Sequence, residues 1–117
     1  ATGAAYHHKR DATQAYAQEI VHELQGELTP EDVVVTTFPD DAPIRYYFDL
    51  YDVGSGDVFS YQTDEFQRAI VLVNEPRGQT IESVLEKQSF PSELVEIDTA
   101  EEIGRHKHLT IYAVEHR

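Results

Sequence analysis

Hydrophobic residues recur every three to four positions in the first third of the chain, which is the spacing of an amphipathic helix. Within DATQAYAQEIVHELQGEL, residues 11 to 28, one apolar stripe steps by four through Ala12, Tyr16, Ile20 and Leu24. Asp11 is placed to cap the start of this helix, and Gly26 is placed to end it. We therefore predict a helix over this segment.

Two later segments are apolar without a clean alternation, as is typical of strands covered on both faces. They are VVVTTF, residues 33 to 38, and AIVLVN, residues 69 to 74. The segment HLTIYAVEH near the C-terminus does alternate, and it predicts a strand with Leu109, Ile111 and Ala113 on one face. DVFSYQ, residues 57 to 62, and ELVEID, residues 93 to 98, are shorter strand candidates.

The aromatic-rich segment PDDAPIRYYFDLYD fits two structures. A strand would place on one face Ile44, Tyr46, Phe48 and Leu50. A helix would group Ile44, Tyr47, Phe48 and Tyr51. We favour the helix, because Asp40 or Asp41 supplies a cap and Pro43 lies in the first turn, where its missing N–H costs nothing. In this interpretation the aromatic cluster is mainly a core contact.

The remaining elements complete an alternation of helices and strands. TIESVLEKQ predicts a helix capped by Thr80. Thr99 and Glu102 form a capping-box pattern that predicts a very short helix ended by Gly104. The alternation predicts one α/β domain over residues 11 to 117, a small Rossmann-like three-layer sandwich with a mainly parallel sheet. Residues 1 to 10 are expected to be a linker or a frayed end.

The charge balance changes which partners are plausible. The 117 residues include 22 Asp and Glu but only 9 Lys and Arg, a formal net charge of −13. Nucleic acid is not expected as a partner, because phosphate binding needs clustered cations. The acids are spread along the chain, and our preferred explanation is a salt-rich environment, with an ordinary acidic domain as the alternative. The chain begins with Ala1 and not Met, which we interpret as a processed product or a piece of a longer protein.

No motif with catalytic or cofactor chemistry is found in its proper context. A glycine-rich phosphate loop is missing after the first strand, so we expect no dinucleotide cofactor. Cysteine is absent, which excludes disulfides and thiolate metal sites. The histidine pairs His7 with His8 and His106 with His108 lack a third ligand at diagnostic spacing, so we expect surface histidines and no metal. A metal-responsive binding protein that uses His106 and His108 remains the alternative.

A binding groove in an open α/β sheet is expected beyond the carboxyl ends of its strands. Asp40 and Asp41 follow the first predicted strand, while Asn74 and Arg77 follow the strand at residues 69 to 74. Two further candidates, Tyr46 and Tyr47, could border such a groove. We therefore predict binding residues at these six positions and no catalytic residue.

Three segments carry a resemblance to a known family. They are LTPEDVVVTTFPDDAPIRYYFDLYD, RAIVLVNEPRGQTIESVLEKQ and the closing LTIYAVE. Together they resemble the soluble C-terminal domain that follows the membrane helices of polytopic, lipid-linked-sugar glycosyltransferases, the dolichyl-phosphate-mannose protein mannosyltransferase-like group. In that family the catalytic carboxylate lies in the membrane part. The resemblance thus implies a non-catalytic accessory or recognition domain on the extracytoplasmic face, beside the membrane portion of its parent protein, with a glycan or acceptor as a possible ligand.

Overall fold

The computed structural model describes the backbone of residues 2–54, 58–59 and 66–117, and the side chains of residues 15–54, 58–59 and 66–117. Its helices and strands follow in the order α1 (Thr2–Glu27), β1 (Asp32–Val35), α2 (Asp41–Leu50), β2 (Arg68–Asn74), α3 (Ile81–Lys87), β3 (Glu101–His106) and β4 (Leu109–Glu115). Short 3-10 turns follow β2 and precede β3, at Glu75–Arg77, Ser92–Leu94 and Ile97–Thr99.

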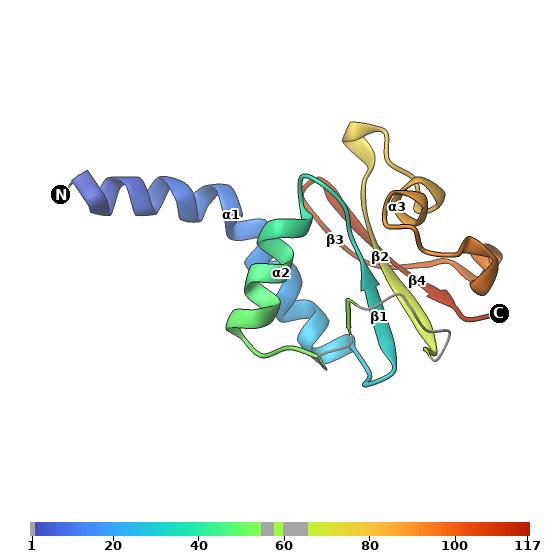
Figure 1. The fold of residues 1–117 in the computed structure, drawn as a ribbon. Helices are drawn as coiled ribbons and strands as arrows, with labels where there is room; N and C mark the ends of the chain where they lie inside the picture. The colour runs from blue at the N-terminus through green and yellow to red at the C-terminus, as the bar shows by residue number, and fades with distance from the viewer. Residues whose placement is uncertain (1, 55–57, 60–65) are drawn as a thin grey trace.

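The sheet is mixed and mostly antiparallel, so the predicted mainly parallel, Rossmann-like sheet is wrong. Among the described residues it has four strands in the order β1-β2-β4-β3 (Figure 1). Only β1 and β2 pair in parallel, with Val34 opposite Ile70. β4 runs antiparallel to both of its neighbours. The two valine-rich segments pair with each other, and among the described strands β1 is the outermost on its side of the sheet.

The difference between the predicted and the observed sheet arises in the last third of the chain. β3 and β4 are joined by Lys107 and His108 alone, and a connection of two residues permits only an antiparallel hairpin. The short helix predicted after Thr99 is instead the strand β3, with a bulge between Glu102 and Gly104. The Thr99 hydroxyl does not cap a helix, because it accepts a hydrogen bond from the Glu115 N–H.

Two other strand predictions also had different outcomes. ELVEID forms parts of two 3-10 turns, and its Val95 makes only an isolated bridge to His116. Most of DVFSYQ lies outside the described residues, and its described pair, Val58 and Phe59, lies in a turn.

Two hydrophobic cores explain why β1 and β2 lack polar alternation. Toward α1 and α2, the sheet contributes Val34, Ile70 and Leu72 to the first core. Toward α3, it contributes Val33, Val35, Ala69, Val71 and Val73 to the second. Because both faces of these strands are covered, every position is free to be apolar. This part of the sequence prediction is confirmed.

The helical interpretation of the aromatic segment is also confirmed. α2 buries Ile44, Tyr47 and Phe48, and it leaves Tyr46 and Leu50 exposed on its outer face. Asp40 occupies the N-cap position, but its side chain makes no capping hydrogen bond. That carboxylate is used elsewhere, as described below.

α1 is longer than its sequence pattern predicts. It begins at Thr2 and continues through Gly26 to Glu27, and its first turns project away from the body of the domain (Figure 1). Its second half is the part that packs on the sheet, through Ala17, Ile20, Val21 and Leu24. Within the described part of the chain, no helix combines the length and the apolar character needed to cross a membrane.

Candidate functional site

The parallel pairing of β1 and β2 brings two predicted site residues together. Parallel strands end at the same edge of a sheet, and here Asp40 follows β1 while Asn74 ends β2. The Asn74 Nδ2 group donates a hydrogen bond of 3.0 Å to Asp40 Oδ2, and both residues are buried. The residues that follow the two strands thus share one buried contact.

Asp40 also receives donors from two other segments. Tyr16 of α1 donates its hydroxyl to Asp40 Oδ1 at 2.8 Å. His108, in the turn between β3 and β4, places Nε2 2.8 Å from the same oxygen. The rings of Tyr16 and His108 meet edge to face, with their centres 4.4 Å apart. We call Asp40, Tyr16, Asn74 and His108 the Asp40 cluster.

The burial and the charge of Asp40 affect the protonation of the neighbouring Tyr16. The Asp40 side chain is only 3% exposed, and a carboxylate at such a site is stabilised by donors from its surroundings. The pKa of Tyr16 is raised above its usual range, first by burial and then by its hydrogen bond to Asp40 and the charge of that residue. Tyr16 therefore stays a neutral hydrogen-bond donor at physiological pH.

An exposed aromatic ring lies beside the cluster. Phe38 is 73% exposed, and Gln79 Nε2 donates to its carbonyl oxygen at 3.2 Å. The Gln79 side-chain oxygen accepts from the Asn74 N–H at 2.9 Å, so Gln79 links Phe38 to the cluster. The guanidinium carbon of Arg77 lies 5.9 Å from the centre of the Phe38 ring. We call Phe38, Arg77 and His108 the strand-end surface.

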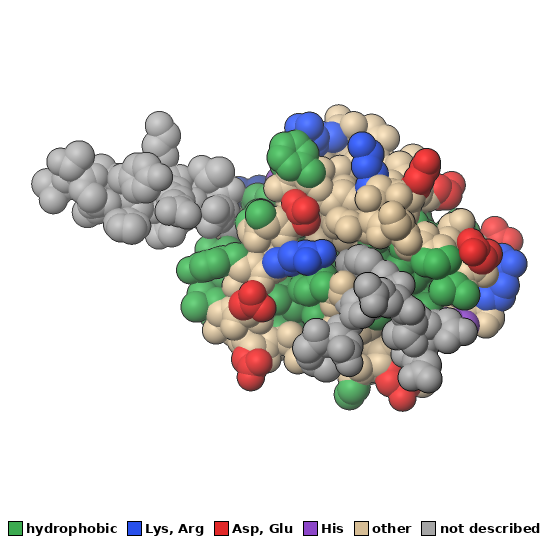
Figure 2. All heavy atoms as spheres, in the orientation of Figure 1, with side chains coloured by type: hydrophobic (Ala, Val, Ile, Leu, Met, Phe, Trp, Pro, Cys, Tyr) green, Lys and Arg blue, Asp and Glu red, His purple; other side chains and the backbone are tan. Residues whose placement is uncertain are grey.

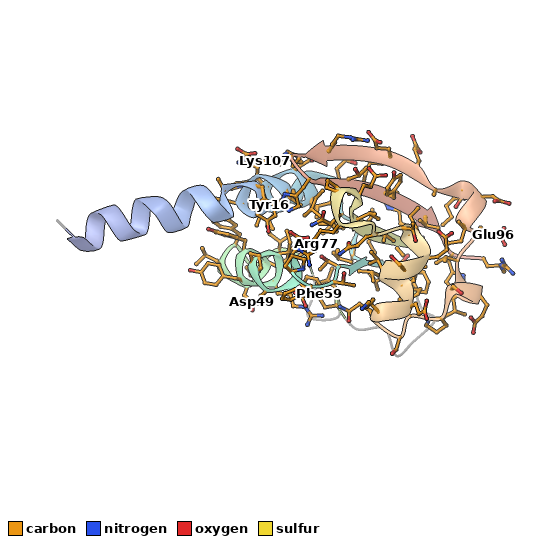
Figure 3. All side chains as sticks on the ribbon, turned by 90° about the horizontal axis from the view of Figure 1, so that it is seen from above. Tyr16, Asp49, Phe59, Arg77, Glu96 and Lys107 are labelled. Atoms are coloured by element: carbon orange, nitrogen blue, oxygen red, sulfur yellow. The ribbon has the colours of Figure 1, made fainter. Side chains whose placement is uncertain are left out.

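The figures show the surroundings of this surface. Figure 3 looks down onto this end of the sheet, with Tyr16 and Arg77 labelled. In Figure 2, hydrophobic and basic side chains lie next to each other at the top of the view, above a lower face on which acidic side chains are frequent. Phe38 and Arg77 together give the strand-end surface an exposed apolar ring and a positive charge, on a chain of net charge −13.

The other predicted binding residues lie apart from the cluster. Asp41 is partly buried, and its carboxylate accepts a hydrogen bond from the adjacent Ala42 N–H. Tyr47 belongs to the first hydrophobic core, where its ring stacks on Tyr51. Tyr46 is 56% exposed on the outer face of α2. Among the six predicted positions, Asp40 and Asn74 are in contact and Arg77 lies next to them.

Sequence reasoning missed three residues of the site. Tyr16 was assigned to the apolar stripe of the first helix, where its ring does pack against the first core. Phe38 and Gln79 were not singled out. Phe38 was included in the apolar segment predicted as a strand, residues 33 to 38, whereas β1 ends at Val35 and leaves Phe38 outside the sheet. The pairing of Tyr16 with Asp40, 24 positions away, has no local sequence signature.

The two histidines of HKH contact different carboxylates. His108 faces Asp40, whereas His106 faces Glu23 and Glu19 of α1. Among the residues whose side chains are described, no group of three or more potential metal ligands is placed to hold an ion. The geometry therefore does not join these histidines into one site.

Two open hollows lie elsewhere on the domain. One of about 340 Å³ is bordered by the end of α1 and by Asp52, Val53 and Gly54. The other, of about 370 Å³, lies below α3 and is lined in part by Glu82, Glu86 and Glu93. Neither hollow is lined by a residue of the Asp40 cluster or of the strand-end surface.

Comparison with known proteins does not place the chain in a family. No family model matches it, and no curated protein or solved structure shows a significant similarity to it. The function must therefore be argued from its own residues.

Proposed function

We propose that this protein is a non-catalytic recognition domain that binds its ligand on the strand-end surface. In keeping with the resemblance of its sequence, we further propose that it serves as an accessory domain on the extracytoplasmic side of a lipid-linked-sugar-dependent membrane glycosyltransferase. The observation that carries the binding proposal is the exposed Phe38 ring, whose backbone carbonyl accepts a hydrogen bond from Gln79, two residues before the buried and hydrogen-bonded Asp40.

The hydrogen bonds of Asp40 support a structural role for this carboxylate. A catalytic acid or base must reach the atom whose proton it transfers. Both oxygens of Asp40 instead accept hydrogen bonds from within the domain, from Tyr16, Asn74 and His108. These bonds join α1, β2 and the β3–β4 turn, so they favour a rigid base for the surface above them.

The chemistry of the strand-end surface favours a ligand with both an apolar face and polar groups. An exposed aromatic ring offers a flat surface for stacking, and the Arg77 guanidinium beside it offers several donors in a fixed plane. Sugar rings have both features, with C–H groups on one face and hydroxyls around the rim. A glycan, or a glycan-bearing acceptor, is thus the ligand class that we propose.

Titration with mannose oligosaccharides tests the proposed site. We expect NMR chemical-shift changes centred on Phe38, Asn74 and Arg77 in the isotope-labelled domain. Replacing the stacking ring in Phe38→Ala should weaken binding by about three- to tenfold, the range of one aromatic contact. Tyr46→Ala is the matched control, because Tyr46 is also an exposed aromatic residue but lies on the outer face of α2. Equal losses in both variants would contradict the assignment.

The non-catalytic part of the proposal has its own test. The isolated domain should show no sugar-transfer or hydrolase activity. Turnover that disappears in His108→Gln would instead make the Asp40 cluster catalytic.

The membrane context is tested through the parent gene. Many hydrophobic segments of about 20 residues upstream of the domain would support it. A lone signal peptide would favour a free-standing binding protein.

A further inference from the structure

Arg77 has no carboxylate partner among the side chains that the structure describes. Acidic residues outnumber basic ones in this chain by more than two to one, 22 against 9. Three other arginines form salt bridges, namely Arg68, Arg105 and Arg117. Arg77 forms none within the described part of the chain, and its guanidinium lies instead beside the exposed ring of Phe38. Its N–H donors are thus available to a ligand.

The acidic residue nearest to Arg77 in the sequence is directed elsewhere. Glu75 lies two positions before Arg77, but its carboxylate accepts hydrogen bonds from two hydroxyl groups of β4. Thr110 donates to Oε1 at 2.8 Å, and Tyr112 donates to Oε2 at 3.2 Å. The Asp40 carboxylate is buried and receives its own donors. Neither carboxylate forms a salt bridge with Arg77.

Hydrogen bonds fix the backbone from which the Arg77 side chain extends. Arg77 ends the 3-10 turn Glu75–Arg77, and its N–H donates to Asn74 Oδ1 at 3.3 Å. The Gly78 N–H donates to the Glu75 carbonyl oxygen at 2.8 Å. Gly78 has a φ of 83°, a conformation that glycine adopts without strain. Because this turn is already ordered, less conformational freedom is lost when Arg77 contacts a ligand.

A second cation belongs to the same end of the sheet. Asn74, the last residue of β2, pairs with Leu109, the first residue of β4, so the turn after β2 and the turn before β4 lie at neighbouring strand ends. Lys107 belongs to the second of these turns and is exposed. Figure 3, which looks down onto this end, labels both Lys107 and Arg77. Two basic residues therefore lie at one end of a domain whose net charge is −13.

We propose that Arg77 recognises a negatively charged substituent of the ligand, so that the strand-end surface binds an acidic sugar. This inference rests on the proposed glycan site and adds the charge of its ligand. The Phe38 ring stacks on the C–H face of the sugar, and the Arg77 guanidinium donates to two oxygens of a carboxylate or a phosphate group. Lys107 adds attraction at longer range. The acidic remainder of the surface disfavours binding of the same ligand elsewhere.

Sugars of similar size test the charge of the ligand. NMR titration of the isotope-labelled domain at low salt compares methyl mannoside, methyl glucuronide and mannose 6-phosphate. We expect each acidic sugar to bind about two- to fivefold more tightly than the neutral one, the range of a partly exposed ion pair. Molar NaCl should remove this preference, because it screens the charges. Inorganic phosphate should bind more weakly than mannose 6-phosphate, because it has no face to stack on Phe38.

Variants of Arg77 assign the preference to its guanidinium. Arg77→Gln should weaken the acidic sugars more than the neutral one, so that their affinities become nearly equal. Arg77→Lys should restore part of the preference, because lysine keeps the charge but not the planar pair of donors. Arg45→Gln is the matched control, since the Arg45 guanidinium also lies over an aromatic ring, that of Phe59, but projects from α2. It should leave the preference unchanged.

The outcomes separate this inference from the proposed function. Equal affinities for the neutral and the acidic sugars would overturn the inference and leave the glycan site in place. Equal effects of Arg77→Gln and Arg45→Gln would also overturn it, as would inorganic phosphate that binds as tightly as mannose 6-phosphate. If none of the sugars bound, both the inference and the proposed glycan site would fail.

Discussion

At the scale of single residues, Asp40 is the most constrained polar side chain of the candidate site. An ionised carboxylate taken out of water is tolerated only when donors surround it. Tyr16, Asn74 and His108 supply these donors from three different elements. The same residue that occupies the N-cap position of α2 therefore connects α2 to the rest of the domain.

Replacing this carboxylate by an amide tests its role. Asp40→Asn retains the shape but directs an NH₂ group at a donor, so we expect a loss of about 2 to 4 kcal/mol in the free energy of unfolding. Asp41→Asn is the matched control, since Asp41 bonds the neighbouring Ala42 N–H, and it should cost less than about 1 kcal/mol. Chemical denaturation measures both. A loss below about 1 kcal/mol for Asp40→Asn, no larger than that for Asp41→Asn, would show that the cluster adds little stability.

At the scale of elements, α2 has one packed face and one solvent face, and the two can be separated by mutation. Phe48 is 2% exposed and packs in the first core, edge to face with Phe59. Phe48→Ala should cost about 3 to 5 kcal/mol, because it leaves a cavity among Ile44 and its neighbours. Leu50→Ala, on the exposed face, should stay within about 0.5 kcal/mol. Urea unfolding decides the matter, and a loss below about 1 kcal/mol for Phe48→Ala would favour an exposed aromatic surface.

The elements that the sequence predicts correctly are those with a local signature. The helix period of α2 and the apolar runs of β1 and β2 reflect direct burial, which any sequence window can reveal. β3 has no such signature, because only one side of this edge strand packs and Thr99 with Glu102 imitates a helix cap. For the candidate site the same limit applies. Asp40 and Asn74 are predictable from strand ends, whereas their contact with Tyr16 depends on how α1 docks.

At the scale of the whole molecule, the β3–β4 hairpin, which the sequence analysis did not predict, changes the fold class. Helices and strands alternate along most of the chain, and that order alone fits a parallel sheet. The hairpin of β3 and β4 inserts β4 beside β2, so two of the three strand pairings are antiparallel. Local sequence patterns do not reveal the order of the strands in the sheet, because that order depends on pairings between segments that are far apart in the sequence.

The acidic surface makes a prediction for the molecule as a whole. With 22 acidic and 9 basic residues, the folded chain repels itself, and added salt screens that repulsion. We therefore expect the thermal unfolding midpoint to rise between low salt and molar NaCl. Measuring it in NaCl and in KCl checks that the effect follows ionic strength. A flat midpoint would remove the salt-adapted interpretation.

The second half of α1 packs on the sheet, while its first turns project away from the domain. A tilt of the packed half therefore moves the N-terminal end of the helix over a larger distance. Among the side chains that the structure describes, Tyr16 is the first of α1 that packs on the first core, and Thr2 lies 14 residues before it along the helix, or about 21 Å at the rise of an α-helix. A tilt of about 10° about the docked end would move the far end of the helix by about 4 Å. A small change in the contacts of Glu19 and Glu23 with His106 would therefore displace the N-terminal end of α1 farther than its docked end.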